Sequence, residues 1–227
     1  MIYFESTITV LLKEDIYLNR AGEAEGELLK AAMPLSDHLK ELHAQRGIKL
    51  YCYDYMYPRA EEKRYLKNRV YYFKMRTPVE QTANEFSKVL NGFETERFKV
   101  VGCQHQKKKF HEKTEIYTTT PAICTLGRQY WQLEHGMDSV QEKIEKNLVS
   151  KYQVYFRETP ERDSGFINYL QLKNKKPITV KYKTGSLVGN KFVIGFDADE
   201  VSQKMAFLAY TTSILEKSSS LGSGFCI

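Results

Sequence analysis

The 227-residue sequence predicts an α+β protein composed of two tandem units of similar size. Several segments alternate apolar and polar residues and are rich in β-branched side chains, which is typical of strands. Other segments carry apolar residues at three- and four-residue steps, which is typical of amphipathic helices. The two kinds of segment follow the same order in both halves of the chain, so each half is expected to form one unit.

The first half begins with a strand followed by helical segments. Residues 2–12 alternate and predict the strand, and the polar residues 13–27 follow it. Residues 28–42 carry leucines at helical spacing, but Pro34 interrupts the pattern, so two short helical pieces are expected. Ser36 is predicted to cap the second piece, and Gly47 to end it in the left-handed conformation.

The rest of the first half predicts two strands around a third helical segment. Extended, tyrosine-rich residues lead into a strand, after which Thr77 is predicted to cap a helix with Pro78 and Glu80 in its first turn. Gly92 is predicted to end that helix. The elements concerned are the extended residues 49–55, the strands 70–76 and 93–103, and the helix 79–90. The order β-α-β-β-α-β is that of a ferredoxin-like, or RRM-like, unit.

The second half predicts the same plan again. Its last helix is expected to be capped by Asp197 with Glu200, and its tail reads as a Gly/Ser loop running into a short terminal strand. The predicted elements are a β-rich segment over 114–124, a helix from Asp138, strands over 178–182 and 192–196 separated by turn signals at 184–185 and 189–190, and the tail 217–227. We therefore expect one unit over residues 1–113 and another over residues 114–227.

Composition narrows the functional classes. Hydrophobic residues at 42% and charged residues at 27% allow a packed core and exclude wholesale disorder. A net charge of +6, with 16 Tyr and 12 Phe, suits a surface that holds phosphates and stacks on bases, although a β-rich core has the same composition. No membrane span and no signal peptide are visible, so a cytoplasmic protein without a membrane partner is expected.

No pattern in the sequence supports a cofactor or a metal. The four cysteines are far apart and form no CxxC pair, which argues against a zinc site and against a disulfide framework. We expect them to be free and mostly buried thiols. Nucleotide-binding, metalloprotease and calcium-loop motifs are also missing, so neither a cofactor nor a metal is expected.

The first candidate site joins a histidine and a lysine across a tight turn. Helical spacing places His43 at the edge of the apolar stripe in the last turn of its helix, whereas His38 falls on another side. Gly47 allows the chain to reverse, so Lys49 can face the same pocket as His43. The imidazole could accept the proton of an RNA 2′-hydroxyl, and the ammonium could stabilise charge on phosphorus. The alternative is a solvated histidine and a surface lysine.

Two further stretches could hold RNA. Residues 104–113 place lysines between two histidines, with Phe110 among them, which resembles a phosphate-gripping hairpin; the alternative is a solvated basic loop. Residues 173–176 repeat this signal more weakly. The candidate residues are Lys107, Lys108, Lys109, His111 and Lys113.

Near the C-terminus, Gly222 and Gly224 flank Ser223. The main chain could approach a phosphate or a base there, or it could simply form a turn.

Taken together, these stretches resemble the CRISPR-associated endoribonuclease family that cuts precursor CRISPR RNA within its repeats, part of the RAMP superfamily. Residues 35–53 look like the family's first helix, catalytic histidine and following strand. Residues 71–77 look like its central strand, and residues 215–227 are similar to its C-terminal glycine-rich loop. The resemblance spans the whole length as architecture and these three stretches as motif.

The resemblance implies a metal-independent endoribonuclease that produces 2′,3′-cyclic phosphate and 5′-hydroxyl ends. It assigns proton transfer to His43 and charge stabilisation to Lys49. Some members add a catalytic tyrosine in the helix; this sequence has none there, which leaves the role vacant or open to another tyrosine such as Tyr17. The terminal loop also has fewer glycines than is usual. The implied partners are CRISPR repeat RNA and subunits of a CRISPR effector complex, with a monomer and a homodimer both open.

Two other functions remain open at this level. One is a non-catalytic RNA-binding RAMP subunit of an effector complex, which would share the fold and the terminal loop. The other is an unrelated RRM-like module, although no recognisable aromatic RNA-binding signature of that class is present. RNA cleavage that depends on His43 would distinguish the endoribonuclease from both of these functions.

Overall fold

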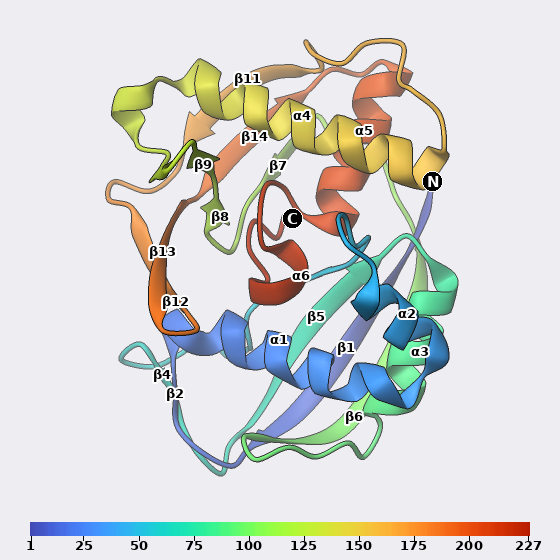
Figure 1. Ribbon diagram of the computed structural model, residues 1–227, viewed down its shortest axis with the longest axis vertical. Coiled ribbons are helices and arrows are strands. Elements are labelled where there is room, and N and C mark those ends of the chain that lie inside the picture. Colours follow the sequence, from blue (N-terminus) through green and yellow to red (C-terminus); the bar gives the residue numbers. More distant parts are fainter.

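A computed structural model describes all residues, 1–227, and shows two α/β units side by side (Figure 1). The first half holds β1 (Ile2–Leu12), β2 (Ile16–Tyr17), α1 (Ala21–Ala32), α2 (Asp37–Ala44), β3 (Cys52–Tyr53), β4 (Arg64–Tyr65), β5 (Val70–Thr77), α3 (Glu80–Leu90) and β6 (Phe98–Lys109). The second holds β7 (Glu115–Tyr117), β8 (Ala122–Ile123), β9 (Thr125–Leu126), β10 (Gln129–Tyr130), α4 (Met137–Phe156), β11 (Ile167–Leu172), β12 (Ile178–Tyr182), β13 (Gly185–Asn190), β14 (Phe192–Phe196), α5 (Glu200–Thr212) and α6 (Ser218–Leu221). Short 3-10 helices cover Leu18–Arg20, Met33–Leu35 and Leu133–His135.

The first unit is a four-stranded antiparallel sheet in the order β3-β5-β1-β6, with helices on one face. Strand β1 therefore lies between β5 and β6, which are the third and fourth strands of this sheet in chain order. This is the ferredoxin-like arrangement that the sequence predicts. Ile8 of β1 lies opposite Phe73 of β5 in the ladder, and both side chains are fully buried. They belong to the same apolar core as Leu28 of α1 and Phe86 of α3.

The second unit repeats the arrangement with a short sheet, β11-β14-β7. The C-terminal residues complete it, because the main chains of Tyr117 and Ile227 exchange two hydrogen bonds of 2.9 Å. Helices α4 and α5 pack on each other, and β12 and β13 form a hairpin that extends toward α1 (Figure 1). The apolar cores are separate, one drawn from residues 8–103 and the other from Tyr3 with residues 110–226. The exact boundary at residue 113 stays a prediction.

A buried arginine joins the two units. The Arg76 guanidinium on β5 is 3% exposed and binds Glu5 at 2.8 Å and the Cys226 carbonyl at 2.7 Å. It also lies 4.0 Å from the centre of the Tyr210 ring on α5, a cation–π contact. Burial raises the cost of separating these charges, so this contact fixes the second unit against the first sheet.

A close approach between α1 and the C-terminal segment also joins the units. Gly22 and Gly26 lie one helical turn apart, on the face of α1 that meets α6. A Cβ atom at Gly22 would lie 2.1 Å from the Leu221 carbonyl oxygen, and one at Gly26 would lie 2.5 Å from that of Ser220. The sequence predicted the helical pattern only from Leu28, after the polar residues 13–27, but α1 begins at Ala21, because this glycine-containing face is buried against the second unit.

Local signals were correct for some helix ends and wrong for others. Ser36 caps α2, and Pro34 lies in the break between α1 and α2, as predicted. Gly47 has a φ of +100°, but α2 ends three residues earlier. The Thr77 hydroxyl binds the Val79 N–H and the Leu50 carbonyl and therefore does not cap α3, which begins at Glu80.

Two predictions in the second half also need correction. Asp199, rather than Asp197, caps α5, because its carboxylate accepts hydrogen bonds from the Val201 and Ser202 N–H groups at 3.1 Å. Residues 189–190, predicted as a turn, end β13 instead. The four cysteines are free and buried, as expected.

Candidate functional site

His43 and Lys49 line one pocket, of about 170 Å³, at the junction of the two units. The walls come from α1, the end of α2, α6 and the β12–β13 turn. The lining residues are Glu23, Gly26, Glu27, Lys30, Met33, His43, Lys49, Tyr51, Tyr182, Lys183, Ser219 and Ser220. The two residues that the sequence placed across a turn therefore face the same space, together with residues from the other half of the chain.

His43 is exposed in the last turn of α2 and is available to a ligand. The helix is held against the protein by Leu39, which is fully buried, and by the cap at Ser36. No protein group forms a hydrogen bond with the His43 ring. His38 behaves differently, since its Nε2 atom lies 3.0 Å from the Thr82 hydroxyl of α3. Of the two histidines on α2, only His43 is free to exchange a proton in the pocket.

Lys49 is held beside His43 by a main-chain contact. Its ammonium donates a hydrogen bond of 2.9 Å to the His43 carbonyl, one of the carbonyls left unpaired at the end of α2. This contact closes the turn that contains Gly47. An ammonium has three donors, so others remain for a ligand.

Positive charge gathers around the imidazole and lowers its pKa. Partial burial lowers the pKa of His43 below its usual value, and the positive charges of Lys49 and Lys30 lower it further. Burial and then Lys30 also lower the pKa of Lys49. A lowered histidine pKa keeps the ring neutral at pH 7, in the form that accepts a proton.

The carboxylates of the pocket are engaged elsewhere. Glu23 pairs with Arg20 at 2.8 Å, and Glu27 pairs with Arg97 at 2.6 Å. Lys30 has no such partner, and its charge is therefore left facing the pocket. This combination of a neutral imidazole with uncompensated ammonium groups suits a phosphodiester.

Two tyrosines, Tyr51 and Tyr182, line this pocket, whereas Tyr17 does not. The Tyr51 hydroxyl donates to the Ser219 carbonyl at 3.2 Å, and burial raises its pKa above its usual value, so it stays protonated. Tyr182 lines the pocket from the β12–β13 hairpin. Tyr17 instead lines a separate cavity. The tyrosine-rich strand after Lys49 was the available signal for Tyr51; no local pattern could have indicated Tyr182.

The glycine-rich loop, residues 222–224, directly follows α6, which lines the pocket. Gly222, Ser223 and Gly224 are buried, and the N–H groups of the two glycines donate to the carbonyls of Ser218 and Pro121. A Cβ atom at Gly222 would lie 2.5 Å from a main-chain oxygen. The N–H groups of Gly222 and Gly224 are therefore engaged within the protein, and contact between residues 222–224 and RNA stays a prediction. The glycines of this loop serve close packing.

The basic stretch lies elsewhere, at the end of the edge strand β6. Lys107, Lys108 and Lys109 pair in register with the start of β1, so they form part of a strand and not the predicted hairpin or a loop. The Lys108 ammonium is bound to buried Glu5 at 2.6 Å, whereas Lys107 and Lys109 are exposed. None of the three lines the His43 pocket.

The two remaining residues of that stretch follow the strand. His111 is exposed and shares a shallow cavity with Lys109. The Lys113 ammonium lies 4.9 Å from the centre of the Tyr210 ring, a cation–π contact at the junction of the units. The structure thus separates the predicted catalytic pair from the predicted basic surface.

No three His, Cys, Asp or Glu side chains come together in an arrangement that could hold a metal ion. None of the helices is both long and apolar enough to cross a membrane.

The fold is similar to those of solved Cas6 and RAMP proteins. An RAMP protein described as binding different RNA substrates has a TM-score of 0.74 at 14% identity, covering 98% of both chains. A Cas6-related protein from Pyrococcus furiosus has a TM-score of 0.72 at 15% identity, covering 99% of this chain and 98% of the other. Cas6 from Thermus thermophilus has a TM-score of 0.62 at 11% identity, covering 100% and 98%. No family model and no curated protein sequence matches. The fold of tandem ferredoxin-like units is thereby confirmed.

Proposed function

We propose that this protein is an endoribonuclease that cleaves precursor CRISPR RNA within its repeats without a metal ion. The observation that carries the proposal is the shared pocket of His43 and Lys49, with Lys30 beside them. The similarity in fold to Cas6 and RAMP proteins, among them one described as binding different RNA substrates, supports RNA as the ligand class.

The chemistry follows from the charge states of the pocket. Neutral His43 takes the proton of the RNA 2′-hydroxyl, whose oxygen attacks the adjacent phosphorus. The bond to the 5′-oxygen breaks, giving a 2′,3′-cyclic phosphate and a 5′-oxygen that takes up a proton from solvent, to which the His43 imidazolium later returns its own. Lys49 stabilises the additional negative charge on the phosphate oxygens in the transition state. Lys30 and Lys183 hold the phosphates on either side.

The proposal assigns supporting roles to the other candidates. Ser219 and Ser220 present polar groups at the pocket, because Gly22 and Gly26 allow α6 to pack closely against α1. Lys107, Lys109, His111 and Lys113 remain proposed contacts to RNA outside the pocket. Lys108 is placed outside that set, since its charge is committed to Glu5.

Cleavage of end-labelled repeat RNA in excess chelator tests the proposal. The wild type is expected to cut and to leave a cyclic phosphate, and His43→Ala is expected to bind the RNA but not to cut it. His38→Ala is the matched control on the same helix and keeps its activity. Intact RNA with the wild type, or equal cutting by His43→Ala, would reject the proposal.

One observation favours a second function. No protein group orients the His43 ring, and positioning of the imidazole is a usual requirement for proton transfer. A non-catalytic RNA-binding subunit of an effector complex would need no such positioning. Binding by the wild type without any cleavage, unchanged in His43→Ala, would select this function.

A further inference from the structure

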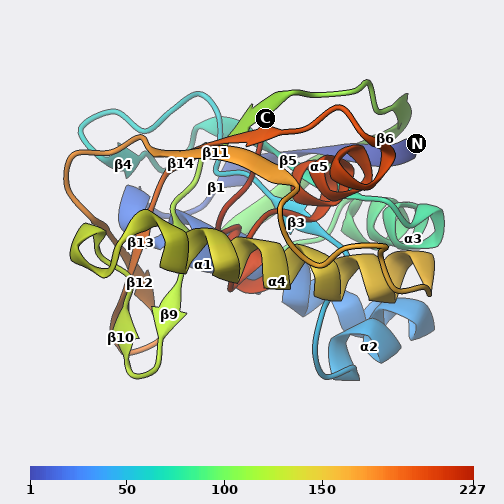
Figure 2. The ribbon, with the colours of Figure 1, turned by 90° about the horizontal axis from the view of Figure 1, so that it is seen from above.

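The outer edge of the first sheet carries main-chain groups that have no partner. Strand β6 pairs with β1 alone, and its end lies beside the N-terminus (Figure 2). In an antiparallel pair, alternate residues direct their main-chain groups toward the partner strand and away from it. The Phe110 N–H binds the Met1 carbonyl, which fixes the residues that face β1. His105, Lys107 and Lys109 therefore face outward, and no protein group binds their main chains on that side.

The side chain of Asn91 closes this edge at Cys103. It accepts a hydrogen bond from the Cys103 N–H at 2.8 Å and donates one to the Cys103 carbonyl at 3.0 Å, as a partner strand would. Before that point, a bulge at Val101 interrupts the pairing with β1. The open edge therefore begins after Cys103 and extends to Lys109, which leaves three outward-facing residues for an added strand.

Unpaired positive charge follows the open edge. Lys107 and Lys109 are exposed and form no ion pair, whereas Lys108 between them is bound to Glu5. The Lys107 and Lys109 side chains point to one face of the sheet, since residues two apart in a strand share a face. A strand added to this edge would place every second side chain beside an ammonium group, which favours acidic residues at those positions.

An open cavity of about 770 Å³ lies on the same face. Ile2 and Phe4 are opposite the two lysines in the ladder, and they line the cavity together with Met1 and Tyr155. Met1 and Ile2 are 40% and 46% exposed, so apolar surface is open to solvent here. The one carboxylate of the cavity, Glu80, is exposed at the start of α3 and pairs with neither lysine. The surface therefore offers apolar contact in addition to main-chain pairing and positive charge.

Neither a second copy of this chain nor RNA matches all three features of the edge. Two such edges brought together antiparallel would place lysine opposite lysine, and like charges in opposite positions destabilise a pair. Lysines on an edge strand thus discourage pairing between chains of the same kind. RNA phosphates would match the ammonium groups but provide no row of donors for the outward carbonyls. An extended acidic segment of a protein supplies donors, acceptors and negative charge together.

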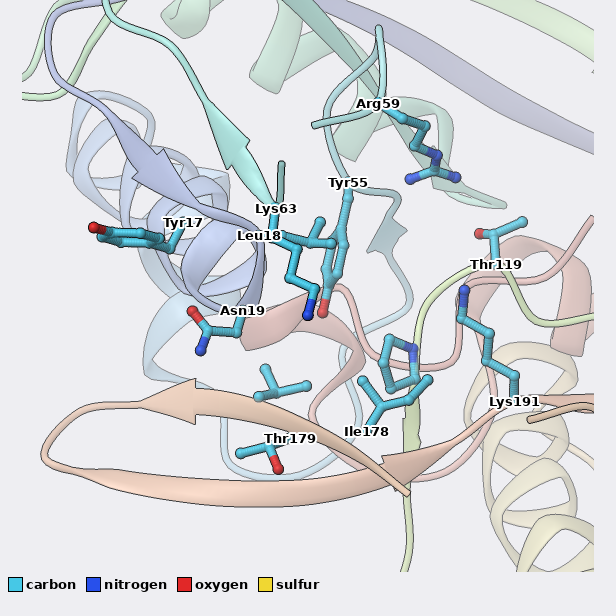
Figure 3. A pocket seen from close by; sticks show the side chains of 12 residues that line it. Tyr17, Leu18, Asn19, Tyr55, Arg59, Lys63, Thr119, Ile178, Thr179 and Lys191 are labelled. Carbon is cyan, nitrogen blue, oxygen red and sulfur yellow. The ribbon is translucent and has the colours of Figure 1, made fainter. Parts of the chain in front are cut away.

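We propose that the β6 edge binds an extended, acidic segment of a protein partner, added antiparallel to this edge with its carboxylates opposite Lys107 and Lys109. The proposal does not depend on RNA cleavage, because this surface shares no lining residue with the His43 pocket. It is equally separate from the cavity between the units that contains Arg59 and Lys191 (Figure 3). RNA contact by Lys107 and Lys109 is the competing assignment, and the test decides between the two.

Binding of a synthetic strand tests the inference. A fluorescent peptide of about eight residues, alternating glutamate and valine, is titrated into the full-length wild type. The matched probe carries N-methyl groups on its glutamate amides, which keeps the charge and removes the donors of strand pairing. The unmodified peptide is expected to bind about tenfold more tightly than the methylated one. Replacing both lysines, Lys107→Gln with Lys109→Gln, is expected to weaken binding about fivefold. Lys99→Gln, an exposed lysine at the start of β6, is the control.

Hydrogen exchange measured by NMR identifies the main-chain groups that pair. The amides of Gln106 and Lys108 are expected to be protected in the free protein, because they face β1. The amides of Lys107 and Lys109 are expected to exchange freely in the free protein and to gain about tenfold protection when the peptide is bound. This alternation along one strand is specific to strand pairing.

Each contrary result overturns the proposal. Equal affinity for the two peptides, or unchanged exchange of Lys107 and Lys109 at saturation, would rule out strand pairing. An absence of binding at about 1 mM peptide would do the same. Repeat RNA that displaces the peptide, combined with equal affinity for both peptides, would assign the lysines to RNA. A wild-type dimer whose formation protects the Lys107 and Lys109 amides would assign the edge to a second copy. These outcomes hold whether or not the protein cleaves RNA.

Discussion

The ammonium of Lys49 donates to the main-chain carbonyl of His43 at 2.9 Å, so the two residues are joined by more than their common pocket. The contact ties the residue after the turn to the last turn of α2. It also keeps a positive charge next to the imidazole, and this charge lowers the pKa of His43. Lys49 is therefore expected to act both on the transition state and on the protonation state of its neighbour.

Replacing Lys49 should slow cleavage far more than it weakens the fold. Lys49→Met is expected to reduce the single-turnover rate about 100-fold, since one donor to a transition-state charge is lost. Lys49 is partly exposed, so its melting temperature should change little. Lys40→Met, an exposed lysine of α2, is the control. A rate within threefold of the wild type would remove Lys49 from the mechanism.

The pH dependence of cleavage should report the charge of Lys30. Burial, then Lys49 and then Lys30 lower the pKa of His43, so the acid limb of the pH–rate profile is expected below the usual histidine value. Lys30→Gln removes one positive charge, so imidazolium becomes easier to form and the acid limb should move to higher pH. NMR titration of the His43 ring checks the same shift directly. A limb that stays in place, or moves to lower pH, contradicts this electrostatic account.

The glycines of α1 should be required for the docking of α6. Gly22→Ala places a methyl group against the Leu221 carbonyl, and the resulting strain is expected to cost about 1–3 kcal/mol of unfolding free energy and to reduce cleavage. Gly102→Ala, where nothing lies within 4 Å of the added atom, is the matched control. Denaturant unfolding compares the two. Equal stability of both variants would show that α6 does not depend on this close approach.

Ionisation of buried Glu25 should lower the free energy of unfolding as pH rises. Its side chain is fully buried, one carboxyl oxygen accepts from the Met56 N–H at 2.7 Å, and the other has no partner. Burial raises its pKa well above the usual value, and the charge of Asp54 raises it further. The folded state therefore holds the Glu25 proton more tightly than the unfolded state. The free energy of unfolding is highest at low pH and falls as pH rises above the pKa of Glu25 in the unfolded chain.

The neutral isostere isolates that effect. Glu25→Gln keeps a carbonyl acceptor for Met56 and is expected to raise the unfolding free energy at pH 7 by roughly 1–3 kcal/mol, with the gain vanishing near pH 4. Denaturant unfolding at both pH values provides the comparison. A gain that is the same at pH 4 and pH 7 would show that protonation of Glu25 is not its source.

The sequence predicted local relationships better than distant ones. His43 and Lys49 are six residues apart, so the end of one helix and one turn were enough to place them in a common pocket. The order of strands and helices was predictable for the same reason, since periodicity is a local property. The α1 helix was missed over residues 21–27 because its glycines have low helix propensity, which only packing against α6 offsets.

The rest of the site depends on contacts between distant parts of the chain. Lys183 and Ser219 reach the pocket from the second unit, and no spacing in the sequence relates them to His43. The lysines of residues 107–109 were expected in a hairpin or in a solvated basic loop. They lie on an edge strand instead, where charged side chains also discourage pairing with other chains.

A crystal structure of the protein with a repeat RNA carrying a 2′-deoxy nucleotide at the cut position would show whether His43 and Lys49 act on the scissile phosphate. We predict that the scissile phosphate lies within hydrogen-bonding distance of the Lys49 ammonium, with the His43 ring facing the 2′ carbon. RNA bound with its scissile phosphate away from both side chains would contradict the account.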